Sequence, residues 1–85
     1  MKVLVIEDEQ LAADRLIRLI QKNHPSYNII GHIDTVRDGI KLLSQENVLI
    51  DLIFCDIHLA DGKCFEIFGE VKTNIPIIFT TAWIE

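Results

Sequence analysis

Short apolar runs alternate with longer amphipathic stretches along the whole chain. An apolar run rich in β-branched side chains is typical of a strand buried on both faces, whereas apolar positions three and four apart are typical of a helix with one buried side. The predicted strands cover residues 2–6, 27–33, 52–55 and 75–79. The predicted helices between them cover residues 10–23, 35–46 and 63–71. This alternation favours an α/β fold with a parallel sheet and right-handed crossovers.

Local signals set some of the expected boundaries. The first helix should end before Pro25, because proline disfavours helical backbone in the preceding residue and donates no hydrogen bond. Asp61 and Gly62 form a pair that is typical of a tight hairpin, but the helical spacing of residues 63–71 favours a turn that leads directly into a helix. Gly39 should weaken the second helix by about 1 kcal/mol relative to alanine.

Composition narrows the functional classes. The 85 residues carry a formal net charge of −5 and 49% hydrophobic side chains, which is typical of one globular domain. Such an acidic domain is a poor binder of nucleic acid, because phosphate contacts need clustered Lys and Arg. No apolar run approaches the roughly 18 residues of a membrane span, and no secretory signal precedes the first strand, so we expect a cytoplasmic protein. Cys55 and Cys64 lack metal-site spacing and are expected to be reduced, structural thiols.

Acidic side chains follow two of the predicted strands. Glu7 and Asp8 come after the first strand, and Asp56 comes after the third. Ligands bind at the carboxyl ends of the strands in an open α/β sheet, so these acids would share one crevice if the two strands are neighbours. Crowded carboxylates repel one another, and a cation relieves the repulsion. A hard, oxygen-liganded ion such as Mg²⁺ is therefore the expected cofactor.

These acids belong to a wider set of motifs. Glu7-Asp8, the run Asp56 to Gly62, and Thr80-Thr81-Ala82 together resemble the receiver domain of two-component response regulators. The runs 56–62 and 76–82 most resemble receivers of the LytTR type. The resemblance covers residues 1–85 as one domain. It implies a flavodoxin-like, CheY-like α/β fold with strand order 2-1-3-4.

The resemblance also implies roles for five residues. Asp56 would accept a phosphoryl group from a phosphohistidine of a sensor histidine kinase. Asp8 and Asp56 would bind Mg²⁺ directly, Glu7 would act through a water molecule, and the backbone carbonyl of His58 would supply a further oxygen. Thr81 would donate its hydroxyl to a phosphoryl oxygen, which would give the loop after the last strand two positions and switch an output domain.

Several of these residues have plainer interpretations. An acid just before a helix is explained by the helix dipole alone, and this applies to Glu7. The imidazole of His58 is expected to be an exposed loop group, and Asp61 is expected to be a turn residue rather than a ligand. Thr80 competes with Thr81 for the phosphate contact, and the alanine that follows Thr81 favours Thr81.

Receivers of this kind continue through a further helix, a fifth strand and a fifth helix, which the 85 residues do not include. In the family, that continuation carries a lysine and a switch aromatic, so neither role falls on a residue of this sequence. The apolar strand 75–79 would then be a sheet edge, and Trp83 would lose the surroundings that bury it. This predicts a homodimer, segment exchange or aggregation through that strand. DNA would be reached only through an absent output domain of the LytTR type.

Other functional classes stay open. The chain is not expected to be an enzyme, because a haloacid-dehalogenase-like phosphatase would need a second acid two positions after Asp56, where His58 stands. A flavodoxin-like nucleotide binder would need a glycine-rich phosphate loop, and the sequence has none. The alternative function is a degenerate or truncated receiver that acts only as a protein-interaction or dimerisation module.

Overall fold

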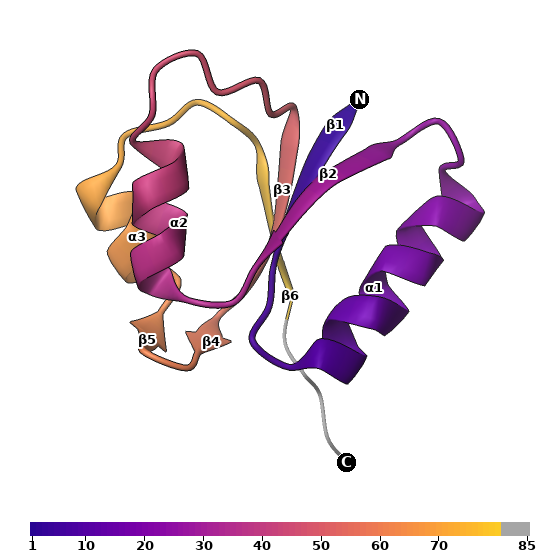
Figure 1. Ribbon diagram of the computed structural model, residues 1–85, viewed down its shortest axis with the longest axis horizontal. Coiled ribbons are helices and arrows are strands. Elements are labelled where there is room, and N and C mark those ends of the chain that lie inside the picture. Colours follow the sequence, from indigo (N-terminus) through magenta and orange to yellow (C-terminus); the bar gives the residue numbers. More distant parts are fainter. Residues whose placement is uncertain (81–85) are drawn as a thin grey trace.

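A computed structural model describes residues 1–80 and confirms the alternation of strands and helices (Figure 1). The elements in chain order are β1 (Lys2–Ile6), α1 (Gln10–Asn23), β2 (Asn28–Ile33), α2 (Val36–Leu43), β3 (Leu52–Asp56), β4 (His58–Leu59), β5 (Gly62–Lys63), α3 (Phe65–Glu70) and β6 (Ile77–Thr80). The strands β2, β1, β3 and β6 form one parallel sheet in that spatial order, which confirms the predicted order. One face of the sheet is covered by α1, and the other by α2 and α3 (Figure 1).

The pairing of β1 with β3 sets the position of the acids. Ile6 lies opposite Cys55, and the two strands run in the same direction. Glu7 therefore leaves the sheet level with Asp56, the last residue of β3. The side chains from Val3 to Ile6 are fully buried, because β1 is a central strand with helices on both faces.

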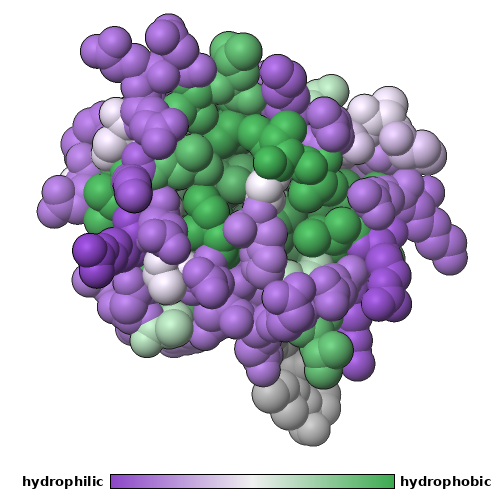
Figure 2. All heavy atoms as spheres, in the orientation of Figure 1, coloured by the Kyte–Doolittle hydropathy of each residue, from purple (hydrophilic) through white to green (hydrophobic). Residues whose placement is uncertain are grey.

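The two faces of the sheet are covered unequally. The main apolar core lies between the sheet and the α2–α3 layer, and it includes Leu4, Ile53 and Ile67. On the other face α1 packs alone, and a groove of about 420 Å³ remains beside it, where Phe54 and Ile78 form part of the lining. Figure 2 shows further apolar surface in the middle of the view, over the sheet edge formed by β2.

Several predicted boundaries differ from the structure by one to three residues. The second helix ends at Leu43 instead of residue 46, because the chain turns there and leads to Asn47, whose φ of 64° does not fit a helix. The third strand includes Asp56, which was predicted to follow it. The last strand begins at Ile77 instead of residue 75, since Pro76 has no N–H to donate to the ladder.

The stretch after β3 forms a short hairpin, so the prediction of a direct turn into a helix was wrong. His58–Leu59 pairs antiparallel with Gly62–Lys63. Gly62 has a φ of 151°, which side-chain-bearing residues rarely adopt. Gly62 pairs with Leu59, so the two loop residues are Ala60 and Asp61 and not the Asp-Gly pair itself. Strands this short show no alternating pattern in the sequence. As a result, α3 begins at Phe65 instead of residue 63.

Gly39 lies at the contact between α2 and α3. A Cβ atom at this position would stand 2.6 Å from Cδ1 of Ile67, whose side chain is fully buried. Glycine therefore lets the two helices approach closely. The sequence indicated only its cost to the helix, whereas the structure shows a packing reason for its presence.

Gly39→Ala should lower the free energy of unfolding by about 1 kcal/mol, because overpacking against Ile67 costs more than the helix propensity of alanine contributes. Gly69→Ala in α3 is the matched control, since a Cβ there meets no atom within 4 Å. The control should be neutral or stabilising by up to about 1 kcal/mol. Urea unfolding followed by circular dichroism measures both variants. A gain in stability for Gly39→Ala would contradict the packing argument.

Candidate functional site

Three carboxylates meet at the carboxyl edge of the sheet. One oxygen from each of Glu7, Asp8 and Asp56 lies within 4.8 Å of the other two. Glu7 and Asp56 are each only 4% exposed, whereas Asp8 is open to solvent. The structure thus brings together the acids that the sequence predicted to share a crevice. A set of hard oxygen donors with several negative charges fits a divalent cation such as Mg²⁺.

Glu7 is held in place by its neighbours. Its N–H donates to the Ile33 carbonyl (2.8 Å), and its own carbonyl lies 2.7 Å from Nε2 of His32. Its Oε2 accepts a hydrogen bond from the N–H of Glu9 (3.1 Å). Burial raises the pKa of Glu7 from 4.5 to about 7 despite that bond, and the negative charge of Asp56 adds to the rise. The Glu7 carboxyl is therefore partly protonated near neutral pH unless a cation compensates the charge.

His58 lies in β4, just beyond the acid that ends β3. Its imidazole is exposed, as predicted. In the hairpin, the Ile57 carbonyl accepts from the Cys64 N–H (2.9 Å), and the N–H of Lys63, the residue opposite His58, donates to Oε2 of Glu66 (2.8 Å). Hydrogen-bonded and non-hydrogen-bonded pairs alternate along an antiparallel ladder. Ile57 and Cys64 form a hydrogen-bonded pair, so the next pair, His58 and Lys63, is not hydrogen-bonded. The partner strand therefore does not use the His58 carbonyl.

Asp61 makes a contact that the sequence did not reveal. It lies at the predicted turn, and its Oδ1 accepts from the N–H of Val36 (2.7 Å) while its Oδ2 accepts from the N–H of Arg37 (3.0 Å). These two hydrogen bonds hold the pKa of the Asp61 carboxyl below its usual value. The donors stand 25 and 24 residues earlier in the chain, so no local pattern indicates the contact.

The predicted switch residue, Thr81, lies outside the described residues, and its role stays a prediction. Thr80 is the last residue of β6 and lies opposite Asp56 in the ladder. The buried hydroxyl of Thr80 has no hydrogen-bond partner in the part of the chain that the structure describes. This edge of the sheet therefore has hydrogen-bonding capacity that the described residues do not use.

Two cysteines lie close to Asp56 in the chain and the fold. Cys55 precedes it in β3, and Cys64 stands directly before α3; both are fully buried free thiols. Burial raises the pKa of both thiols above the ordinary value. They are protonated at neutral pH, which agrees with the predicted structural role.

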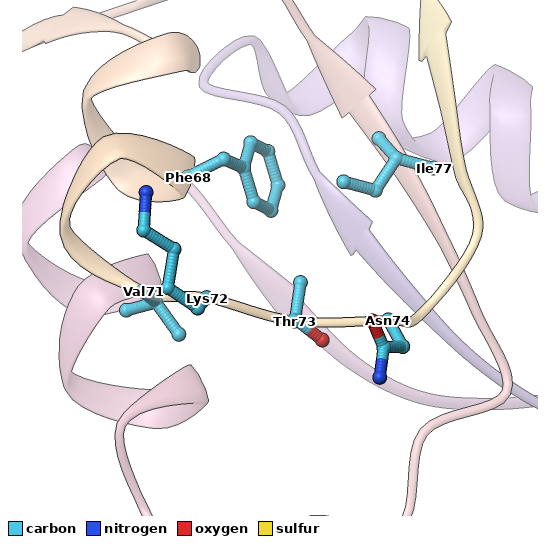
Figure 3. Close-up of a pocket in the computed structure, with 6 residues that line it drawn as sticks. All are labelled: Phe68, Val71, Lys72, Thr73, Asn74 and Ile77. Carbon is cyan, nitrogen blue, oxygen red and sulfur yellow. The ribbon is translucent and has the colours of Figure 1, made fainter.

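Two surface cavities lie away from the acids. One of about 390 Å³ is lined by Phe68, Val71, Lys72, Thr73, Asn74 and Ile77 (Figure 3). Phe68 and Ile77 face each other across it, at the amino end of β6, whereas the acids stand at the carboxyl ends of β1 and β3. The other is the groove beside α1. No carboxylate lines either cavity, so the acidic cluster is the better candidate site.

Comparison with known proteins identifies the family. The profile of the response regulator receiver domain matches residues 3–85. The chain is 41% identical to Sensory transduction protein LytT of Bacillus cereus over 98% of the chain, and 38% identical to Transcriptional regulatory protein YpdB of Escherichia coli over its whole length. It spans about a third of these relatives, 34% of LytT and 35% of YpdB. The crystal structure of the response regulatory domain of MrkE from Klebsiella pneumoniae matches with a TM-score of 0.78 and 34% identity, covering 100% of this chain and 70% of that one.

The chain therefore belongs to the response regulator receiver domain family, whose members are signalling modules of two-component systems. Within that family its relatives are regulators of the LytTR type, as the sequence predicted. The fold is the CheY-like α/β fold that this resemblance implied. Within residues 1–80, no helix combines the length and the apolar character that a membrane crossing requires.

Without Mg²⁺, the free energy of unfolding should fall as the pH rises from about 5 to about 8. The folded-state pKa of Glu7 is raised from 4.5 to about 7, so its contribution is fully present below 4.5 and is lost as the pH passes through 7. The loss should reach up to about 3 kcal/mol. Mg²⁺ should restore the stability at the upper end of this window.

Glu7→Gln is the control for this pH dependence, because the amide cannot ionise. Its profile should be flatter than that of the wild type in the presence of EDTA. Urea titrations across the pH window, each with EDTA and with Mg²⁺, measure the effect. Identical profiles for the wild type and Glu7→Gln would show that Glu7 is not the group responsible.

Proposed function

We propose that this receiver accepts a phosphoryl group on Asp56 from a phosphohistidine of a sensor histidine kinase. The observation that carries the proposal is the cluster of Glu7, Asp8 and Asp56 at the ends of two paired central strands. In the transfer, the bond between the imidazole nitrogen and phosphorus breaks, and a carboxylate oxygen of Asp56 bonds to phosphorus to give an acyl phosphate. Positioning and charge neutralisation dominate such a reaction, and an acidic cluster that holds a divalent ion supports both.

Each acid has a distinct part in holding Mg²⁺. Asp8 and Asp56 are the direct ligands, Glu7 acts through a water molecule, and the His58 carbonyl supplies a further oxygen. The outer role of Glu7 is supported by its burial and by the N–H of Glu9, which already uses its Oε2. The role of His58 is supported by a carbonyl that the hairpin leaves unused. When bound, the ion supplies positive charge against the incoming phosphate.

Thr81 is the proposed switch residue. Phosphorylation raises the negative charge at Asp56 from one to roughly 1.5–2 and adds acceptor oxygens. Because Thr80 lies opposite Asp56, the chain leaves the described part of β6 at the level of the phosphate. A hydrogen bond from the Thr81 hydroxyl to a phosphoryl oxygen would give the loop after β6 two alternative positions.

The relatives suggest what the switch controls. YpdB is called a transcriptional regulatory protein and LytT a sensory transduction protein. The proposed output is a DNA-binding domain of the LytTR type, which would act in the cytoplasm and is not among these residues. The formal net charge of −5 agrees with DNA contacts made by another domain.

Incubation with acetyl phosphate and Mg²⁺ should add one phosphoryl group to the chain, as measured by intact-protein mass spectrometry. Asp56→Asn should abolish the mass gain, and Asp8→Asn should slow it by about 10–100-fold, because a metal ligand is lost. Asp14→Asn is the matched control, since this acid of α1 bonds only to Gln10 among the described residues. No Mg²⁺-dependent mass gain in the wild type would refute the proposal.

The edge of β6 is a second proposed contact surface, for another copy of this chain. Among the described residues β6 pairs only with β3, and its Ile78 and Phe79 are each 46% exposed. An apolar strand edge with unpaired backbone groups is a template for a further strand. These features support a homodimer or an exchange of segments through β6.

Sedimentation velocity should show self-association that increases with protein concentration. Ile78→Lys should raise the dissociation constant by about tenfold or more, because a charge must then be buried at the contact. Ile30→Lys is the control, since Ile30 is 44% exposed on β2, at the opposite edge of the sheet. Only monomer at every concentration would count against the contact, as would an equal effect of the two variants.

A further inference from the structure

The amino terminus of α2 is capped by two residues from different parts of the chain. The hydroxyl of Thr35, the N-cap of the helix, accepts from the N–H of Asp38 (3.0 Å). The N–H groups of Val36 and Arg37 donate to Asp61 (2.7 and 3.0 Å). These first amides have no partner within the helix and carry partial positive charge, which a carboxylate complements. A residue of the hairpin after β3 thus completes the cap of α2.

The same hairpin follows directly on the proposed phosphoacceptor. At its base, the N–H of Ile57 donates to the Thr80 carbonyl (3.2 Å). In its first strand, Leu59 is buried in the apolar core. At its turn, two hydrogen bonds from the N–H groups of Val36 and Arg37 to Asp61 attach the hairpin to α2. His58, whose carbonyl is the proposed ligand, lies between the base and the turn.

We propose that Asp61 is a positioning residue of the phosphoacceptor site, which clamps the hairpin to the first amides of α2 and so fixes the main chain at His58 beside Asp56. The proposal rests on the function proposed above for Asp56. Asp61 is not one of the proposed ligands and would act only through the hairpin.

A clamp matters here because the ligand at His58 is a backbone atom. A side-chain ligand can adjust by changing its rotamer, whereas a peptide carbonyl moves only when the hairpin moves. Groups that orient a metal ligand from outside typically account for about 10–100-fold in affinity or activity. The coupling is reciprocal, so an ion that orders the hairpin also strengthens the bonds from Val36 and Arg37 to Asp61.

The plainer alternative is that Asp61 only stabilises α2. Thr35→Ala separates the two roles, because it removes a cap of the same helix without touching the hairpin. If helix stability alone mattered, losing either cap would affect the site alike.

The test compares wild type, Asp61→Ala, Asp61→Asn and Thr35→Ala in the whole chain. Isothermal titration calorimetry gives the Mg²⁺ dissociation constant, and mass spectrometry gives the rate of phosphorylation by acetyl phosphate. Asp61→Ala should weaken Mg²⁺ binding and slow phosphorylation by about tenfold each, while Thr35→Ala should stay within about twofold of the wild type. Asp61→Asn keeps one acceptor oxygen and should lie between Asp61→Ala and the wild type.

Amide hydrogen exchange gives a readout that does not depend on phosphorylation. Mg²⁺ should slow amide exchange at Val36 and Arg37 in the wild type. The slowing should be smaller in Asp61→Asn. If Asp61→Ala does not fold, Asp61→Asn and these amides decide the question. Equal Mg²⁺ affinities in the Asp61 variants and the wild type, or equal losses in Asp61→Ala and Thr35→Ala, would overturn the clamp alone. A wild type that shows no Mg²⁺-dependent phosphorylation would overturn the proposed function and the clamp with it.

Discussion

The parallel pairing of β1 with β3 is the constraint on which the rest of the structure depends. It aligns Ile6 with Cys55, so the two strands end at the same level and bring Glu7 and Asp56 together. Both acids are almost fully buried there, although burial and mutual repulsion oppose their charges. Full burial of one Val, Leu or Ile side chain contributes about 1.5–3 kcal/mol. The four buried side chains of residues 3–6 therefore outweigh the cost of about 3 kcal/mol for charging Glu7, which comes first from its burial and then from its proximity to Asp56.

The acidic cluster therefore links stability to ligand binding. The raised pKa of Glu7 reflects a carboxylate that is unfavourable when charged in its buried position. A bound cation would favour the charged form and add its binding free energy to that of folding. The same crowding that opposes the charged form of Glu7 would favour a bound cation at this site.

The hairpin after β3 connects the acids to the helical layer on one face of the sheet. Asp61 attaches the turn to the start of α2, and Gly39 of α2 packs closely on Ile67 of α3. The site, the hairpin and these two helices thus form one continuous set of contacts. On the other face α1 stands alone, which leaves Ile78 of β6 partly exposed (Figure 1).

The sequence by itself determined the order of the strands and helices and the three acids, because buried parallel strands are continuous apolar runs and Glu7, Asp8 and Asp56 stand at their ends. It indicated the hairpin only through the Asp-Gly pair, since two-residue strands have no period to detect. The bonds of Asp61 to α2 and the packing of Gly39 join residues far apart in the chain. Only the tertiary structure decided these contacts. The free amides at a helix terminus can bond to any acceptor that the fold brings near, and a close contact between two helices depends on how the fold places them.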